Sequence, residues 1–93
     1  MELSEFVGQP CKTQLAFEFF PKKPVSLGLQ KVAAGLKKSK LLVDFETPVF
    51  VGVVVDATSV SIFRNGKILV KDTKDKIFAQ KIAEKILSAI KSL

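Results

Sequence analysis

The sequence predicts an α+β fold in which a curved antiparallel sheet of about five strands carries two helices on one face, in the order β-α-β-β-β-β-α. Two observations predict this class: short apolar runs separated by turn residues, and two longer segments whose apolar residues recur every three or four positions. A chain of 93 residues, 47% of them hydrophobic, is large enough for one core and one domain. We assign the domain to residues 11–93 and expect an irregular lead-in over residues 1–10.

The first strand is expected over residues 13–20, because large apolar side chains occupy every second position from Leu15 to Phe19. The two prolines of the segment Pro21–Pro24 remove backbone donors and should end the strand. With nothing before it to pair with, this strand would be an edge of the sheet.

A first helix should follow Ser26, whose hydroxyl could cap it. Its buried face would consist of residues at helical spacing, namely Leu29, Val32, Ala33 and Leu36. Lysines gather at its end, in the segment Lys37–Lys40. They could interact favourably with the negative end of the helix dipole or bind phosphate, and the sequence leaves both interpretations open.

Four further strands are expected over residues 41–45, 49–55, 59–64 and 67–71. The Asn65-Gly66 loop between the last two decides which residues share a face. A two-residue loop would mix apolar and polar side chains on both faces, whereas a three-residue loop with a left-handed Gly66 pairs Phe63 with Lys67. We predict the second register, because hydrophobic pattern sets register where one face is buried. It places Val60, Ile62, Ile68 and Val70 under the helices, and Ser61, Phe63, Lys67, Leu69 and Lys71 on the opposite face.

The chain should end with a long helix over about residues 75–91, capped by Asp72 or Thr73. Its apolar stripe, which we expect to cover the sheet, comprises Phe78, Ile82, Ile86, Ala89, Ile90 and Leu93.

Residue types that carry catalysis are scarce. The chain has no histidine and one cysteine, Cys11, and its five glycines are scattered, so we expect no enzyme, no metal site, no cofactor and no phosphate loop. An unpaired cysteine and an acidic N-terminus without an apolar core favour a cytoplasmic protein, and no apolar run reaches the length of a membrane span. The net charge of +6 suits a polyanionic partner or serves solubility.

From Val43 onward, the stretch Asp44–Val53, the hairpin Ser61–Val70 and the amphipathic helix after it together resemble one repeat of the TATA-box-binding-protein-like fold. The hairpin Ser61–Val70 resembles the Ile-Phe-x-x-Gly-Lys-hydrophobic hairpin of that family, and an amphipathic helix follows it, with Ala83 and Ile86 in the pattern Ala-x-x-Ile. Upstream, Asp44–Val53 is similar to the family's acidic-aromatic stretch ending in Phe-x-Gly-hydrophobic. The similarity covers about half of the chain in motifs and nearly all of it in the order of elements.

The resemblance implies that a bare, concave sheet face binds the minor groove of DNA, with paired phenylalanines wedged between base steps. At the matching positions the wedge pair would be Phe50 and Phe63. The candidate nucleic-acid-binding residues are Phe50, Phe63, Lys67, Leu69, Lys71 and Gln14.

Two functions follow as hypotheses, each using this face. The first is binding of DNA or RNA by a homodimer joined across the edge strand 13–20, which would form a two-fold saddle. The second is docking of a protein partner on a surface that Val54 and Leu69 make apolar and that Glu18 and Asp56 make less suited to phosphate.

Overall fold

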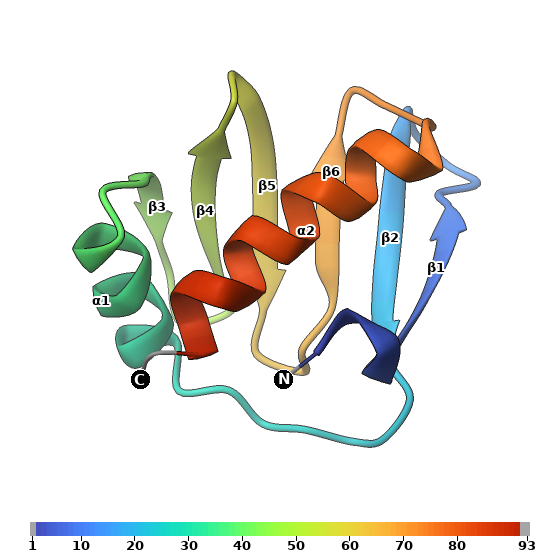
Figure 1. Ribbon diagram of the computed structural model, residues 1–93. Coiled ribbons are helices and arrows are strands. Elements are labelled where there is room, and N and C mark those ends of the chain that lie inside the picture. Colours follow the sequence, from blue (N-terminus) through green and yellow to red (C-terminus); the bar gives the residue numbers. More distant parts are fainter. Residues whose placement is uncertain (1, 92–93) are drawn as a thin grey trace.

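The computed structural model describes residues 2–91 and has one layer of strands and one layer of helices (Figure 1). The helices are α1 (Leu29–Lys38) and α2 (Lys76–Lys91), and a short 3-10 helix η1 spans Leu3–Glu5. The strands are β1 (Phe6–Pro10), β2 (Ala16–Pro21), β3 (Leu42–Glu46), β4 (Phe50–Val55), β5 (Thr58–Phe63) and β6 (Ile68–Lys71). The predicted α+β class is therefore confirmed, with six strands in place of about five.

The additional strand lies in the segment expected to be irregular. Residues 1–10 contain η1 and β1, and β1 pairs antiparallel with β2 from Phe6 opposite Pro21 to Pro10 opposite Phe17. Gly8 and Pro10 both lower the strand propensity of this segment, so the sequence did not predict β1. The expectation that residues 13–20 form a free edge is wrong, because β1 covers β2 on that side.

The sheet has the order β1-β2-β6-β5-β4-β3, and every neighbouring pair is antiparallel. Its two outer strands are thus β1, from the N-terminus, and β3, which follows α1 (Figure 1). The predicted strand ranges agree with the observed ones to within a few residues, because turn residues bound each apolar run.

The predicted register of the last hairpin is confirmed. The amide of Phe63 donates to the carbonyl oxygen of Lys67 at 2.9 Å, and Ile62 stands opposite Ile68. Gly66 has φ +92°, the left-handed conformation that a three-residue loop requires. Ile62, Ile68 and Val70 are buried on the helix-covered face, so the side chains that alternate with them in β5 and β6 point to the other face.

Both helices pack on one face of the sheet, but neither cap is the predicted one. The N-cap of α1 is Gly28 rather than Ser26, and it makes no side-chain hydrogen bond. For α2 the cap is Asp75 rather than Asp72 or Thr73. One carboxylate oxygen of Asp75 accepts hydrogen bonds from the amides of Ile77 at 3.0 Å and Phe78 at 3.2 Å. The sequence predicts that the helix includes Asp75, whereas α2 begins one residue later, at Lys76. A helix boundary is uncertain by one or two residues, because the N-cap and the first turn favour the same residue types.

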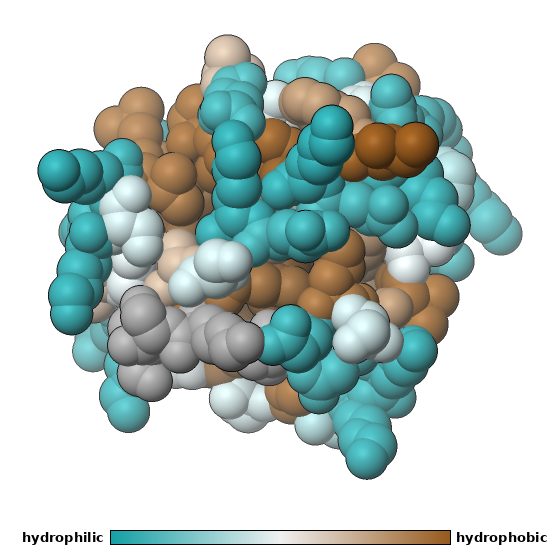
Figure 2. Space-filling view, in the orientation of Figure 1, coloured by the Kyte–Doolittle hydropathy of each residue, from teal (hydrophilic) through white to brown (hydrophobic). Residues whose placement is uncertain are grey.

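The core lies between the helices and the sheet. Its buried helix residues include Val32 and Leu36 of α1 and Ile82 and Ile86 of α2, as predicted. The expectation for Phe78 is wrong: this side chain is exposed, and Ala79 is buried beside it because a small residue fits the close approach of α2 to the sheet. Leu93 lies outside the described residues. Hydrophilic residues follow the outer side of α2 (Figure 2).

Within residues 2–91, neither helix combines the length and the apolar composition that crossing a bilayer requires.

Candidate binding surface on the open sheet face

The sheet face opposite the helices, here called the open face, is where most of the predicted binding residues lie. Phe50 and Phe63 stand directly opposite each other on β4 and β5, and their ring centroids are 5.7 Å apart. Lys67, Leu69 and Lys71 follow one another at every second position and share this face with Phe63. The predicted pair of phenylalanines is therefore adjacent in space.

A continuous line of phenylalanines crosses the open face. The ring of Phe45 on β3 lies 6.4 Å from that of Phe50, measured between centroids, and Phe63 follows on β5. The ammonium of Lys67 lies 5.3 Å from the ring centroid of Phe63 and 5.5 Å from that of Phe20 on β2. We call Phe45, Phe50, Phe63 and Phe20 the phenylalanine row, with Lys67 bridging its two parts.

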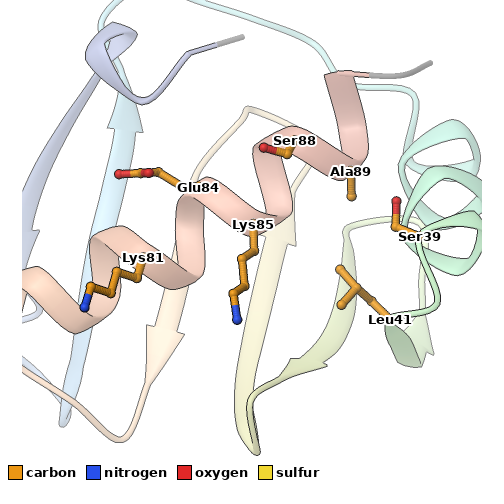
Figure 3. Close-up of a pocket in the computed structure, with 7 residues that line it drawn as sticks. All are labelled: Ser39, Leu41, Lys81, Glu84, Lys85, Ser88 and Ala89. Carbon is orange, nitrogen blue, oxygen red and sulfur yellow. The ribbon is translucent and has the colours of Figure 1, made fainter.

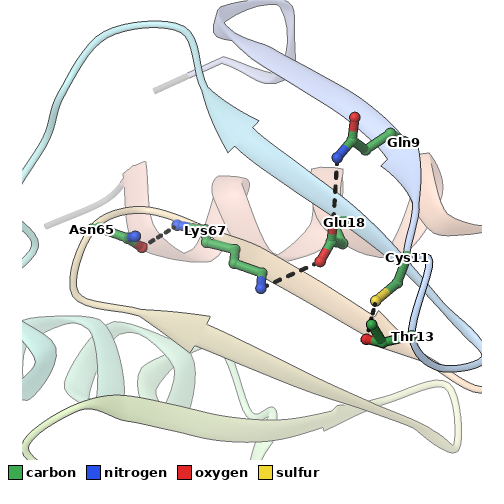
Figure 4. Close-up of polar contacts among 6 residues, drawn as sticks. All are labelled: Gln9, Cys11, Thr13, Glu18, Asn65 and Lys67. Carbon is green, nitrogen blue, oxygen red and sulfur yellow. Dashed lines mark hydrogen bonds and ion pairs between the residues drawn. The ribbon is translucent and has the colours of Figure 1, made fainter.

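Lys67 is also the centre of the polar contacts on this face (Figure 4). Its ammonium forms an ion pair with a carboxylate oxygen of Glu18 at 3.3 Å, and the side-chain amide of Gln9 donates to the other oxygen at 3.4 Å. Partial burial raises the pKa of Glu18, but the Gln9 hydrogen bond and the Lys67 charge outweigh it, and the net pKa is lowered. Glu18 is thus held ionised beside the row.

Leu69 does not form part of the exposed surface. The loop over residues 11–15 folds onto this end of the open face, and Leu69 packs with Cys11 and Ala16 in a small apolar cluster. The cluster is held by two backbone contacts of Cys11: its amide donates to the carbonyl oxygen of Ala16 at 2.9 Å, and its carbonyl oxygen accepts from the Lys74 ammonium at 2.8 Å. Leu69 is therefore buried, with 5% of its surface exposed, and does not lie on the accessible part of the open face.

The Cys11 thiol lies 3.5 Å from the hydroxyl oxygen of Thr13 (Figure 4). This hydrogen bond and nearby backbone amides lower the pKa of Cys11. The thiol is buried within the small cluster, and its contacts hold the 11–15 loop against the sheet.

The remaining predicted residues have different positions. Lys71 ends β6 opposite Ala16 and is half-buried on the open face. Gln14 is exposed in the loop before β2 and belongs to no strand, so it is not placed in the sheet as expected. Asp56 turns away from the open face, because its carboxylate pairs with the Lys85 ammonium of α2 at 2.5 Å. Of the two acidic residues expected on this face, only Glu18 lies there.

Sequence reasoning missed Phe45 and Phe20 as members of the row. Phe20 could have been found, since it shares its parity with Glu18 along β2. Phe45 could not, because the register of β3 shifts between Val43 and Phe45, which places Phe45 opposite Gly52. A Cβ atom on Gly52 would come within 3.1 Å of the Phe45 ring, so the glycine leaves room for it.

A hollow of about 540 Å³ lies on the helix side, between α2 and the segment that leads into β3 (Figure 3). Glu84 projects from α2 in a different direction from Lys81 and Lys85, and Lys85 is engaged with Asp56. The polar side chains that line this hollow therefore do not converge on a common point where a ligand could bind. Among residues 2–91, no three Cys, Asp or Glu side chains are grouped so that they could hold a metal ion.

Comparison with protein-family models, curated proteins and solved structures finds no significant match to this chain. The function must therefore be inferred from the geometry and chemistry of the open face.

Proposed function

We propose that this chain is a non-enzymatic binding module that binds nucleic acid through its open face. The observation that carries the proposal is the phenylalanine row with Lys67 at its centre. Aromatic rings exposed on a sheet stack on bases, and an ammonium group between them can reach a phosphate. The net charge of +6 favours a polyanionic ligand over a neutral one.

Two features support a half-saddle like the repeat that the hairpin resembles. From β2 onward the elements follow the order strand, helix, four strands, helix, and Phe50 and Phe63 are neighbours on the uncovered face. In the family such a pair wedges between base steps of DNA.

The test is a fluorescence-anisotropy titration of labelled duplex DNA, single-stranded DNA and RNA at two salt concentrations. We expect binding that weakens with salt, since each phosphate contact contributes a slope of about −0.7 to −0.9 in log K against log salt. Lys67→Ala and Phe63→Ala should weaken binding. The matched controls are Lys81→Ala and Phe78→Ala, which change exposed residues of α2 on the opposite side of the sheet. If both open-face variants bind like the wild type, the open face is not the binding surface.

A second candidate, a protein-interaction or assembly module, is favoured by the apolar ends of the same face. Val7, opposite Phe20, is 50% exposed, and Leu42, opposite Val54, is 64% exposed. Large exposed apolar side chains on one surface are typical of protein docking sites. This candidate predicts no measurable affinity for any nucleic acid in the titration above.

A homodimeric saddle remains a prediction, but its joint cannot be β2, which is paired on both sides. The free edges are β1 and β3, and β3 is the more apolar of the two because it exposes Leu42 and Phe45. Sedimentation equilibrium at micromolar concentration should give a dimer that Leu42→Lys weakens. A monomer at every concentration would remove the dimer and leave the nucleic-acid proposal standing.

A further inference from the structure

The spacing of the phenylalanine row does not match a stacked duplex. Neighbouring ring centroids are 5.7 Å apart between Phe50 and Phe63 and 6.4 Å apart between Phe45 and Phe50. Stacked bases along a duplex strand are only about 3.4 Å apart. Successive rings can therefore receive successive bases only if those bases are unstacked from each other, as they can be in a single strand.

The inner rings lie against the sheet instead of standing clear of it. Phe50 and Phe63 are half-buried, and their planes are tilted by 36° to each other. A side chain that wedges into a duplex has to project far enough to separate two stacked base pairs. Half-buried rings offer a surface for a base to rest on, which suits a strand laid across the sheet.

The dimensions of the sheet also favour a single strand over a narrow groove. The strands that carry the phenylalanine row have five or six residues, so they extend for roughly 16–20 Å at about 3.3 Å per residue. A minor groove is about 6 Å wide, and the sheet could meet its base edges only after the duplex had been opened and bent. A flexible single strand requires no such deformation.

We infer that the nucleic acid bound by the open face is single-stranded, with its bases stacked on Phe45, Phe50, Phe63 and Phe20 and its backbone passing Lys67. This inference rests on the proposed function and specifies its ligand. Recognition by stacking tolerates any base, because every base has a π-face.

In this arrangement, Glu18 limits the affinity of the open face for the single strand. Its carboxylate is paired with the Lys67 ammonium at 3.3 Å, so a phosphate that approaches Lys67 meets a negative charge. Glu18→Gln removes that charge while keeping a side chain of the same shape, and it should raise the affinity for the strand. The rise should be larger at low salt, where like-charge repulsion is less screened.

The experiment compares two labelled probes. One is a single strand of about ten nucleotides, a length within the site sizes of domains that bind single strands by stacking. The other is a hairpin duplex whose stem has the same number of base pairs as the strand has nucleotides. Oligothymidylate and oligouridylate serve as the two single strands, so that DNA and RNA are tested separately. We expect at least one single strand to bind more tightly than the duplex. Phe45→Ala should weaken that binding roughly five- to 150-fold, which is the range found when the aromatic side chain under one stacked base is replaced by alanine.

Phe78→Ala is the matched control, because Phe78 is also an exposed phenylalanine but lies on α2, which covers the other face. Phe45 is 59% exposed, so its replacement should leave the thermal midpoint close to that of the wild type. Equal or tighter binding of the duplex, or full affinity in Phe45→Ala, would overturn the inference and leave the proposed function in place. An unchanged or lower affinity in Glu18→Gln would overturn the role given to Lys67. Absence of binding to every probe would remove both proposals and leave the protein-interaction candidate.

Discussion

The hairpin between β5 and β6 determines which side chains reach the open face, and Gly66 is its most constrained residue. Gly66 has φ +92°, and a Cβ atom built on it would lie 2.5 Å from Cγ2 of Val25 and 2.9 Å from Cγ of Pro21. A residue with a side chain in the left-handed region costs roughly 1–2 kcal/mol, and forced overpacking costs roughly 1–3 kcal/mol more. We therefore expect Gly66→Ala to lower the free energy of unfolding by about 2–5 kcal/mol, a large part of the about 5–15 kcal/mol of a typical domain.

Urea unfolding followed by far-ultraviolet circular dichroism measures this loss. The control is Gly28→Ala, the same chemical change at the N-cap of α1, where φ is −77° and the nearest atom, Cδ of Lys31, is 3.8 Å from the added carbon. Its cost should stay below about 1 kcal/mol, since Ala is only a poorer cap than Gly. Hydrogen exchange of the Phe63 amide, which donates to Lys67, reports on the loop itself. If Gly66→Ala costs no more than Gly28→Ala and leaves that amide protected, the left-handed loop is not what holds the register.

Three further predictions test other parts of the structure. Ala57→Gly should stabilise the protein by up to about 1 kcal/mol in urea unfolding, because Ala57 has φ +63° in the β4–β5 turn; a loss of stability would contradict this. Gly8→Ala should cost about 1–3 kcal/mol, since its Cβ atom would lie 2.8 Å from the ring of Phe19 and 2.9 Å from that of Phe17. A neutral result would show that β1 does not pack as described. The folded-state pKa of Glu18 is lowered, so its contribution to stability is present above its unfolded value and is lost as pH falls through the folded pKa. The difference between wild type and Glu18→Gln should therefore shrink between neutral pH and about pH 3, and a constant difference would refute this assignment.

Most of the open face could be predicted from local patterns. Apolar residues alternate in β5 and β6, and only the three-residue loop at Gly66 sorts them into one buried face. That preference follows from side-chain parity, which requires no knowledge of distant segments. Phe63 is predicted on the open face for this reason, whereas the prediction of Phe50 rests on the resemblance to the TATA-box-binding-protein-like repeat.

The sequence-based predictions that were wrong concern features that depend on contacts between segments far apart in the chain. β1 forms because Gly8 lets the rings of Phe17 and Phe19 lie against it, and a weak strand sequence cannot reveal such a fit. Leu69 has the parity of an exposed residue, yet the loop that begins at Cys11 covers it.

The amino-acid sequence by itself determined the class of the fold, the position of both helices and the register of the β5–β6 hairpin, because these depend on the periodicity and turn chemistry of neighbouring residues. Only the tertiary structure decided the sixth strand, the β3 bulge that brings Phe45 into the row, and the pairing of Lys67 with Glu18. These features arise where strands distant in sequence become neighbours, and hydrogen-bond pairing across the sheet, rather than local preference, sets which side chains meet there.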